Sequence, residues 1–209
     1  MAYPVQQWNS NREVSASHSL HHPLEYLARR VSHRCIAYNE CCLRWLTKGK
    51  TSVTTNDMSE DGFAQLPSGA EILRVEQVIP GCSPVRAFAY WTTPDLICSW
   101  WPREAEIEPH AGGAYHLIWP DMGWRLRGRY TAFEPGRQLA FTWAWDHDPP
   151  ETTPKLVTVS LAPTAEGTHL TLEHGFYDES PEEQELRIEH HLAGWRHFLP
   201  ALRRVARTL

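Results

Sequence analysis

The sequence predicts an α+β fold in which a curved antiparallel sheet of about six or seven strands wraps around one long C-terminal helix. Two observations carry this prediction. Residues 180–209 hold a one-sided apolar stripe, and residues 103–174 hold a series of alternating segments separated by turns. A sheet that curves around a helix rarely fills its own concave side, so we expect a ligand cavity between the two.

The C-terminal helix begins with several start signals. Ser180 is a capping residue, Pro181 suits the first helical position, and Glu183 stands three residues after the cap. Apolar residues then recur at steps of four and three: Ile188, Leu192, Trp195, Leu199, Leu202, Ala206 and Leu209. The resulting stripe runs along a helix of about 40 Å, which needs a broad partner surface.

The strands are predicted from alternation of apolar and polar residues. A first strand spans residues 70–79, and two short helices start at Ser83-Pro84 and Thr93-Pro94. Six further strands are expected at residues 103–109, 114–119, 124–133, 138–145, 156–161 and 168–174. Short turns between successive strands predict an antiparallel meander.

The first part of the chain differs from the rest. We expect residues 1–69 to be an N-terminal extension, largely disordered or loosely helical, and residues 70–209 to be the folded domain. Residues 1–57 have no sustained period and hold seven Lys or Arg against four Asp or Glu, whereas the remainder holds 13 against 21. We hypothesise that translation begins near Met58, which precedes an acidic lead-in to the patterned domain.

Composition excludes several classes of partner. The acidic body argues against nucleic acid, because phosphate binding needs a basic surface. Five irregularly spaced cysteines predict no disulfide framework, and no secretory segment or membrane span is recognisable. We therefore expect a cytoplasmic protein. The histidine and cysteine spacings, including His190, His191 and His197 of the long helix, match no usual metal site, so no metal or other cofactor is predicted.

A set of motifs in fixed order carries a resemblance to a known family. These motifs are Val85-x-x-Phe88, Trp91-Thr92-x-Pro94-Asp95, Trp100-Trp101-Pro102, Gly112-Gly113, Gly128, Pro135-x-x-x-Leu139-x-Phe141-Thr142-Trp143, Gly167-Thr168-x-Leu170-Thr171-x-x-His174 and Gly194-Trp195. The chain resembles the START-like or SRPBCC superfamily, in the branch named after the activator of the heat-shock protein 90 ATPase homologue. The resemblance covers about residues 70–208 and implies a helix-grip fold with an apolar cavity. It implies no single function.

Residues on the expected concave surface are the candidates for ligand binding: Trp119, Tyr130, Trp143, Trp145, Leu172, His174, Trp195 and Leu199. The aromatic side chains suit a flat or apolar ligand, although core packing explains them equally well. His174, at the end of the last strand, is a polar anchor or a weak candidate for an acid–base group. Gln77 is a second polar anchor. The segment Asp146-His147-Asp148 lies in a proline-rich loop, which favours a solvated position.

Three functions remain open at this point. The first is a non-enzymatic carrier or sensor that binds an apolar or aromatic small molecule between sheet and helix. The second is a cyclase-like or hydrolytic enzyme that uses His174 in the same cavity. The third is a chaperone-related interaction domain, and a homodimer also stays open. We expect a binding protein more than an enzyme, because no convergent set of polar residues is recognisable.

Overall fold

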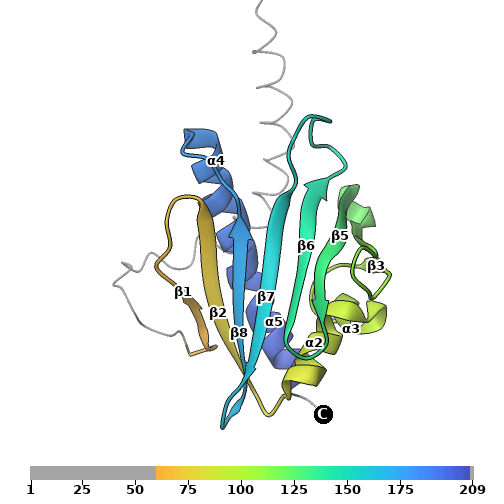
Figure 1. The fold of residues 1–209 in the computed structure, drawn as a ribbon, viewed down its shortest axis with the longest axis vertical. Helices are drawn as coiled ribbons and strands as arrows, with labels where there is room; N and C mark the ends of the chain where they lie inside the picture. The colour runs from red at the N-terminus through yellow and green to blue at the C-terminus, as the bar shows by residue number, and fades with distance from the viewer. Residues whose placement is uncertain (1–59, 208–209) are drawn as a thin grey trace, which may run out of the picture. The chain divides into compact units, whose positions relative to one another are not determined.

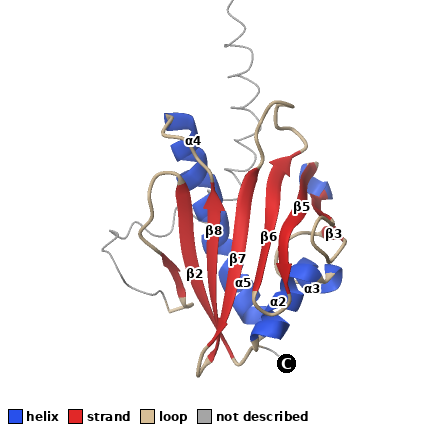
Figure 2. Ribbon diagram, in the orientation of Figure 1, coloured by secondary structure: helices blue, strands red, loops and turns tan. Residues whose placement is uncertain are grey.

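An eight-stranded antiparallel sheet dominates the computed structural model, which describes residues 60–207 (Figures 1 and 2). Its strands are β1 (Phe63–Gln65), β2 (Ile72–Pro80), β3 (Glu104–Ile107), β4 (Ala114–Trp119), β5 (Trp124–Glu134), β6 (Gln138–Trp145), β7 (Lys155–Pro163) and β8 (Gly167–Gly175). The spatial order is β1-β2-β8-β7-β6-β5-β4-β3, so the chain from β3 to β8 is a meander and β2 closes against β8. The α+β class and the antiparallel meander are confirmed.

Alternation along each strand separates an inner face from an outer face. On β8 the inner side chains are Leu170, Leu172 and His174, each 0% exposed, while Thr171 and Glu173 between them reach solvent. The other central strands repeat this pattern. The period of two seen in the sequence therefore places one face of the sheet in the core.

The sheet curves with the help of local features in β5. The register between β5 and β6 shifts between Tyr130 and Ala132, which is a β-bulge, and bulges increase local twist and bend. At Gly128 the neighbouring backbone comes so close that an added Cβ would lie 2.1 Å from the carbonyl oxygen of Thr142. Glycine is therefore required at this point of the curve.

Helical segments lie on one side of the sheet (Figure 2). They are α2 (Pro84–Thr92), α3 (Pro94–Cys98), η1 (Pro120–Met122), α4 (Pro181–Glu185), η2 (Leu186–Leu192) and α5 (Ala193–Ala206). The predicted caps form, since Ser83 Oγ accepts from the Arg86 amide at 3.4 Å and Ser180 Oγ accepts from the Glu183 amide at 3.3 Å.

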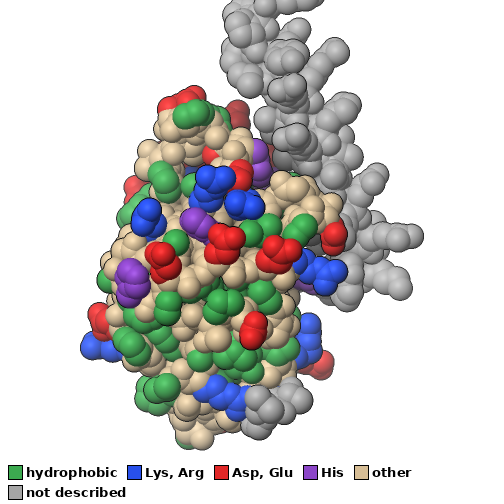
Figure 3. Space-filling model, turned by 90° about the vertical axis from the view of Figure 1, so that its right-hand side faces the viewer, with side chains coloured by type: hydrophobic (Ala, Val, Ile, Leu, Met, Phe, Trp, Pro, Cys, Tyr) green, Lys and Arg blue, Asp and Glu red, His purple; other side chains and the backbone are tan. Residues whose placement is uncertain are grey.

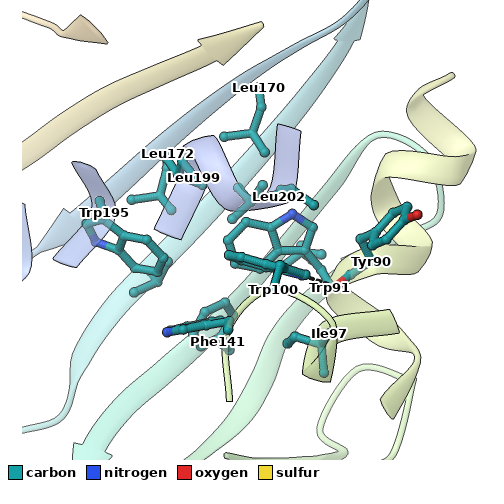
Figure 4. Close-up of a cluster of buried hydrophobic side chains, with 14 of the residues drawn as sticks. Tyr90, Trp91, Ile97, Trp100, Phe141, Leu170, Leu172, Trp195, Leu199 and Leu202 are labelled. Carbon is teal, nitrogen blue, oxygen red and sulfur yellow. Dashed lines mark hydrogen bonds between the residues drawn. The ribbon is translucent and has the colours of Figure 1, made fainter. Parts of the chain in front are cut away.

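The apolar stripe of the C-terminal helix packs onto the inner face of the sheet. Trp195, Leu199 and Leu202 of α5 are at most 2% exposed, and Figure 4 shows them beside Leu170 and Leu172 of β8. Burial of such side chains contributes about 1.5–3 kcal/mol each to folding. The curved sheet that wraps around a long C-terminal helix is thus confirmed.

Two features differ from the sequence prediction. The sheet begins before residue 70, because Phe63–Gln65 pairs with Val75–Gln77 and the Gln77 side-chain amide donates to the Asp61 carbonyl at 2.8 Å. The C-terminal helix also contains a π-helical stretch, η2, where the apolar spacing indicated an α-helix. The predicted extension up to residue 59 and the proposed start at Met58 lie outside the described residues. No described helix is both long and apolar enough to cross a membrane.

Candidate functional site

Five of the eight predicted ligand-binding residues come together in one ring cluster. We define the aromatic end of the fold as this five-residue ring cluster together with Trp101 and His191. It lies where β6 and β8 end and where η2 leads into α5. Trp143 is the centre, with ring centroids 5.6 Å from Trp145, 4.8 Å from His174 and 5.7 Å from Trp195. Trp119 joins through Trp145 at 5.7 Å. These are distances of rings in direct contact.

The rings of the cluster become more exposed from the core towards the surface. Trp195 and Trp143 are buried, at 2% and 8% exposure, whereas Trp145 is half-buried. On the helix side, the half-buried Phe198 lies 6.3 Å from Trp101. The aromatic end therefore has an outer edge of partly accessible rings.

His174 is fully buried and its tautomer follows from its one hydrogen bond. The Trp195 indole Nε1–H donates to His174 Nδ1 at 3.2 Å. Because an indole only donates, Nδ1 carries no proton, and the neutral ring holds its proton on Nε2. Burial is the main cause that holds the pKa of His174 well below its ordinary value, and its neighbours His191 and Lys155 lower it further, so the ring is neutral.

Neither nitrogen of His174 is therefore free to accept a proton. Nδ1 is engaged by Trp195, and Nε2 already carries a hydrogen in the assigned tautomer. This arrangement disfavours His174 as a general base and leaves it as a hydrogen-bond donor. Nε2 has no hydrogen-bond partner among residues 60–207.

His191 and Tyr177 also belong to the aromatic end, although neither was among the residues predicted to bind a ligand. The His191 ring stacks on His174 with centroids 4.1 Å apart, and its Nδ1 lies 2.7 Å from the Tyr177 hydroxyl. Burial is the main cause that lowers the pKa of His191 to about 3, with Lys155 and His190 adding to it. Burial likewise raises the pKa of Tyr177. Both groups are neutral, which suits an apolar site.

One charged pair borders this cluster. Lys155 Nζ lies 2.5 Å from Glu183 Oε2, donates to the Phe176 carbonyl at 3.2 Å and stands 4.7 Å from the centre of the Tyr177 ring. The lysine charge is thus compensated by Glu183 while it still disfavours a second positive charge on the nearby histidines.

The remaining predicted residues occupy other places. Leu172 and Leu199 lie in the core beside Trp195 (Figure 4), whereas Tyr130 donates its hydroxyl to the Trp91 carbonyl at 3.1 Å and contacts Tyr115. Tyr130 therefore holds α2 against the sheet and stands apart from the aromatic end. Gln77 uses its amide to fix the chain before β1, as described above.

Polar residues outside the core form an ordinary protein surface. Asp146 pairs with Arg127 and Arg125, and His147 stacks on Trp145 with ring centroids 5.9 Å apart. The Asp146 loop is thus tied to the outer face of β5. Figure 3 shows acidic and basic side chains interspersed among hydrophobic ones on the face that carries β3.

A shallow groove of about 290 Å³ lies on the outer face of the sheet, across β6, β7 and β8. Its lining is Glu134, Arg137, Gln138, Ser160, Leu161, Ala162, His169 and Thr171. No predicted ligand-binding residue takes part in it. Within residues 60–207, no group of three or more His, Cys, Asp or Glu side chains is placed to hold a metal ion.

Comparison with known proteins places this fold in a family. Among curated proteins no significant match was found. A solved structure of a protein from Rhodobacter sphaeroides is 25% identical with a TM-score of 0.61, covering 71% of this chain and 99% of its own. A protein from Mesorhizobium loti is 28% identical with a TM-score of 0.58, covering 66% of this chain and 98% of its own.

Two further findings concern fold and family. DynU16, described as a protein of the dynemicin biosynthetic locus, shares the fold at 22% identity and a TM-score of 0.56, over 66% of this chain and 48% of its own. The family model described as "Activator of Hsp90 ATPase homolog 1-like protein" matches residues 82–207. This match spans the helices and strands that form the aromatic end, and the chain therefore belongs to the family of activator of Hsp90 ATPase homolog 1-like proteins.

Proposed function

We propose that this chain binds an apolar or aromatic small molecule at the aromatic end, between the curved sheet and the helix made by η2 and α5. The observation that carries this proposal is the continuous set of rings from the buried Trp143 and Trp195 to the half-buried Trp145 and Phe198. Aromatic side chains with neutral polar groups among them are typical of small-molecule sites.

The fold supports the same function. Helix-grip proteins of this superfamily bind hydrophobic ligands between sheet and helix. A carrier or sensor agrees with the engaged nitrogens of His174 better than a cyclase-like or hydrolytic enzyme does. A chaperone-related role has no support beyond the description of the family, and a cytoplasmic location stays a prediction.

The ligand enters by displacing a ring. Trp143 contacts Trp101, Trp145 and Trp195 at centroid distances of 5.6–5.7 Å, so a further ring has no room between these pairs. Trp145 is half-buried and is the last inward position of β6, so its indole is the ring that we expect to swing outward. Binding is thus coupled to a rearrangement at the outer edge of the cluster.

The test is a titration of the full chain with 1-tetralone, tetralin and palmitate, followed by indole NH signals in ¹H–¹⁵N NMR spectra and by calorimetry. We expect saturable binding of at least one compound, with shifts at Trp143, Trp145 and Trp195. Trp145→Ala should weaken that binding about tenfold, because the ring that covers the ligand is lost.

Phe133→Ala is the matched control. Phe133 is also a half-buried ring, but it contacts Phe88 and Tyr130 away from the aromatic end, at 5.1 Å each. Its removal should leave binding unchanged. The proposal is overturned when no compound binds saturably, or when both variants weaken binding equally.

A further inference from the structure

We propose that the ligand of the aromatic end carries a hydrogen-bond acceptor oxygen, as an aromatic ketone does, and that His174 Nε2–H and Trp143 Nε1–H donate to it. This inference rests on the proposed function and names the chemical class of its ligand. It is carried by two buried donors that have no acceptor within the described part of the chain. We call these two groups the open donors.

The direction of the first open donor is fixed by the protein itself. His174 is 0% exposed, and the bond from Trp195 Nε1–H at 3.2 Å requires its Nδ1 to accept. The proton of the neutral ring is therefore on Nε2. Trp195 acts here as a positioning residue, since it selects the tautomer and orients the ring without being the donor to the ligand.

The second open donor is an indole, which can only donate. Trp143 is 8% exposed, and its ring centroid lies 4.8 Å from that of His174. The two N–H groups thus belong to adjacent side chains, on β6 and β8, within one cluster. One oxygen atom has two lone pairs and can accept from both.

The polar groups next to the open donors on the helix side are already paired. Tyr177 and His191 bind each other at 2.7 Å, and Lys155 is held by Glu183 and by the Phe176 carbonyl. Proteins rarely bury donors without an acceptor, because the lost hydrogen bonds to water are not replaced. Trp91 Nε1 behind Trp195 is also buried without a partner among residues 60–207, but only the open donors belong to two polar rings in direct contact. This pair indicates an acceptor supplied by the bound molecule.

This arrangement predicts a preference among ligands of equal shape. A ketone satisfies the open donors, a hydrocarbon leaves them unpaired, and a ligand that offers only donors is disfavoured. An ammonium ion is disfavoured further by the nearby charge of Lys155, which adds to burial in lowering the pKa of both histidines.

The decisive experiment compares 1-tetralone with tetralin, which differ by one C=O in place of CH₂. We expect the ketone to bind wild-type protein at least tenfold more tightly, in line with one to two hydrogen bonds from buried donors. Trp143→Phe keeps an aromatic ring but removes one donor, so it should reduce the preference for the ketone about tenfold while affecting tetralin little.

Tyr115→Phe is the matched control, because Tyr115 is a fully buried residue whose hydroxyl also lacks a partner among residues 60–207 but lies against Tyr130 and Phe141. It should change neither affinity. Equal binding of ketone and hydrocarbon to the wild type overturns this inference and leaves the proposed function standing, whereas absence of binding by both removes the proposed function itself.

A spectroscopic measurement tests the inference without any variant. Imidazole ¹⁵N shifts of His174 in the wild-type protein should report a neutral ring protonated on Nε2, and ketone binding should move the Nε2 and Trp143 indole signals as new hydrogen bonds form. A proton on Nδ1 in the free protein, or unmoved signals with bound ketone, contradicts the assignment.

Discussion

The two ends of the sheet–helix interface treat buried polar groups differently. Around α2, at what we call the closed end, the polar groups of Tyr90, Trp100, Tyr130 and Thr168 donate to backbone carbonyls at distances of 2.6–3.2 Å. At the aromatic end the two open donors have no such partner within residues 60–207. Four donors of the closed end are thus paired with the backbone, whereas Trp91 Nε1 and the Tyr115 hydroxyl are buried there without a partner among residues 60–207. The aromatic end differs because its two open donors belong to rings in direct contact, so that one ligand can reach both.

The closed end ties segments that are far apart in the sequence. Tyr90 of α2 donates to the Val205 carbonyl of α5 at 3.2 Å, and Thr168 of β8 donates to the Cys82 carbonyl at 2.6 Å. The first bond joins α2 to α5, and the second joins the turn before α2 to the sheet.

The largest expected effect is a difference in stability between tryptophans of the two regions. Trp91 of α2 is 0% exposed and contacts Trp100 at 4.8 Å, so Trp91→Ala should lower the free energy of unfolding by about 3–5 kcal/mol. Trp145→Ala should cost about 1 kcal/mol, because its half-buried ring is partly hydrated already. Urea denaturation of both variants measures the difference, and equal losses would remove the distinction between the ends.

The next effect is a loss of stability in mild acid that originates at the aromatic end. In the unfolded chain the histidines titrate near pH 6.5, whereas in the folded chain the pKa of His191 is about 3 and that of His174 is also lowered. The contribution of these two histidines to the free energy of unfolding is therefore fully present above about pH 6.5. It declines as the pH falls below that value, because the unfolded state takes up protons first. For His191 alone the loss in the free energy of unfolding is about 2 kcal/mol at pH 5.

Several groups surround these two rings and must be considered in that experiment. Lys155 and His190 add positive charge, Arg187 is near Tyr177, and Glu183 compensates Lys155. A His174→Phe and His191→Phe double variant should flatten the pH dependence of urea denaturation between pH 8 and pH 5. An unchanged slope would show that the acid sensitivity arises elsewhere.

Much of this fold could be predicted because its signals are periodic. Strand alternation placed His174 and Trp143 on the inner face, and the helical stripe placed Trp195 and Leu199 against it. The strand Phe63–Gln65 was missed, because three residues with one buried Phe form no pattern and their position depends on the Gln77 side chain.

The missing parts of the site are those that depend on contacts between segments distant in the sequence. His191 was recognisable in principle, since it stands three residues after Ile188 and four before Trp195 on the same helical face. Tyr177 lies in a loop without periodicity, and its role appears only through its bond to His191. The π-helical stretch likewise leaves no trace in residue spacing, and neither does the lack of an acceptor for the open donors.

The smallest expected effect compares one indole N–H group at each of the two ends. Trp100 Nε1 donates to the Tyr90 carbonyl at 3.0 Å, whereas Trp143 Nε1 is an open donor. Trp→Phe at either position removes similar ring volume, but Trp100→Phe also leaves a buried carbonyl without that donor. We expect Trp100→Phe to cost about 1 kcal/mol more than Trp143→Phe in urea denaturation of the ligand-free protein. With 1-tetralone bound the difference should shrink, because Trp143→Phe then also removes a formed hydrogen bond. A larger loss of unfolding free energy for Trp143→Phe in the free protein would mean that its indole already has an acceptor. Trp143 Nε1 would then not be an open donor.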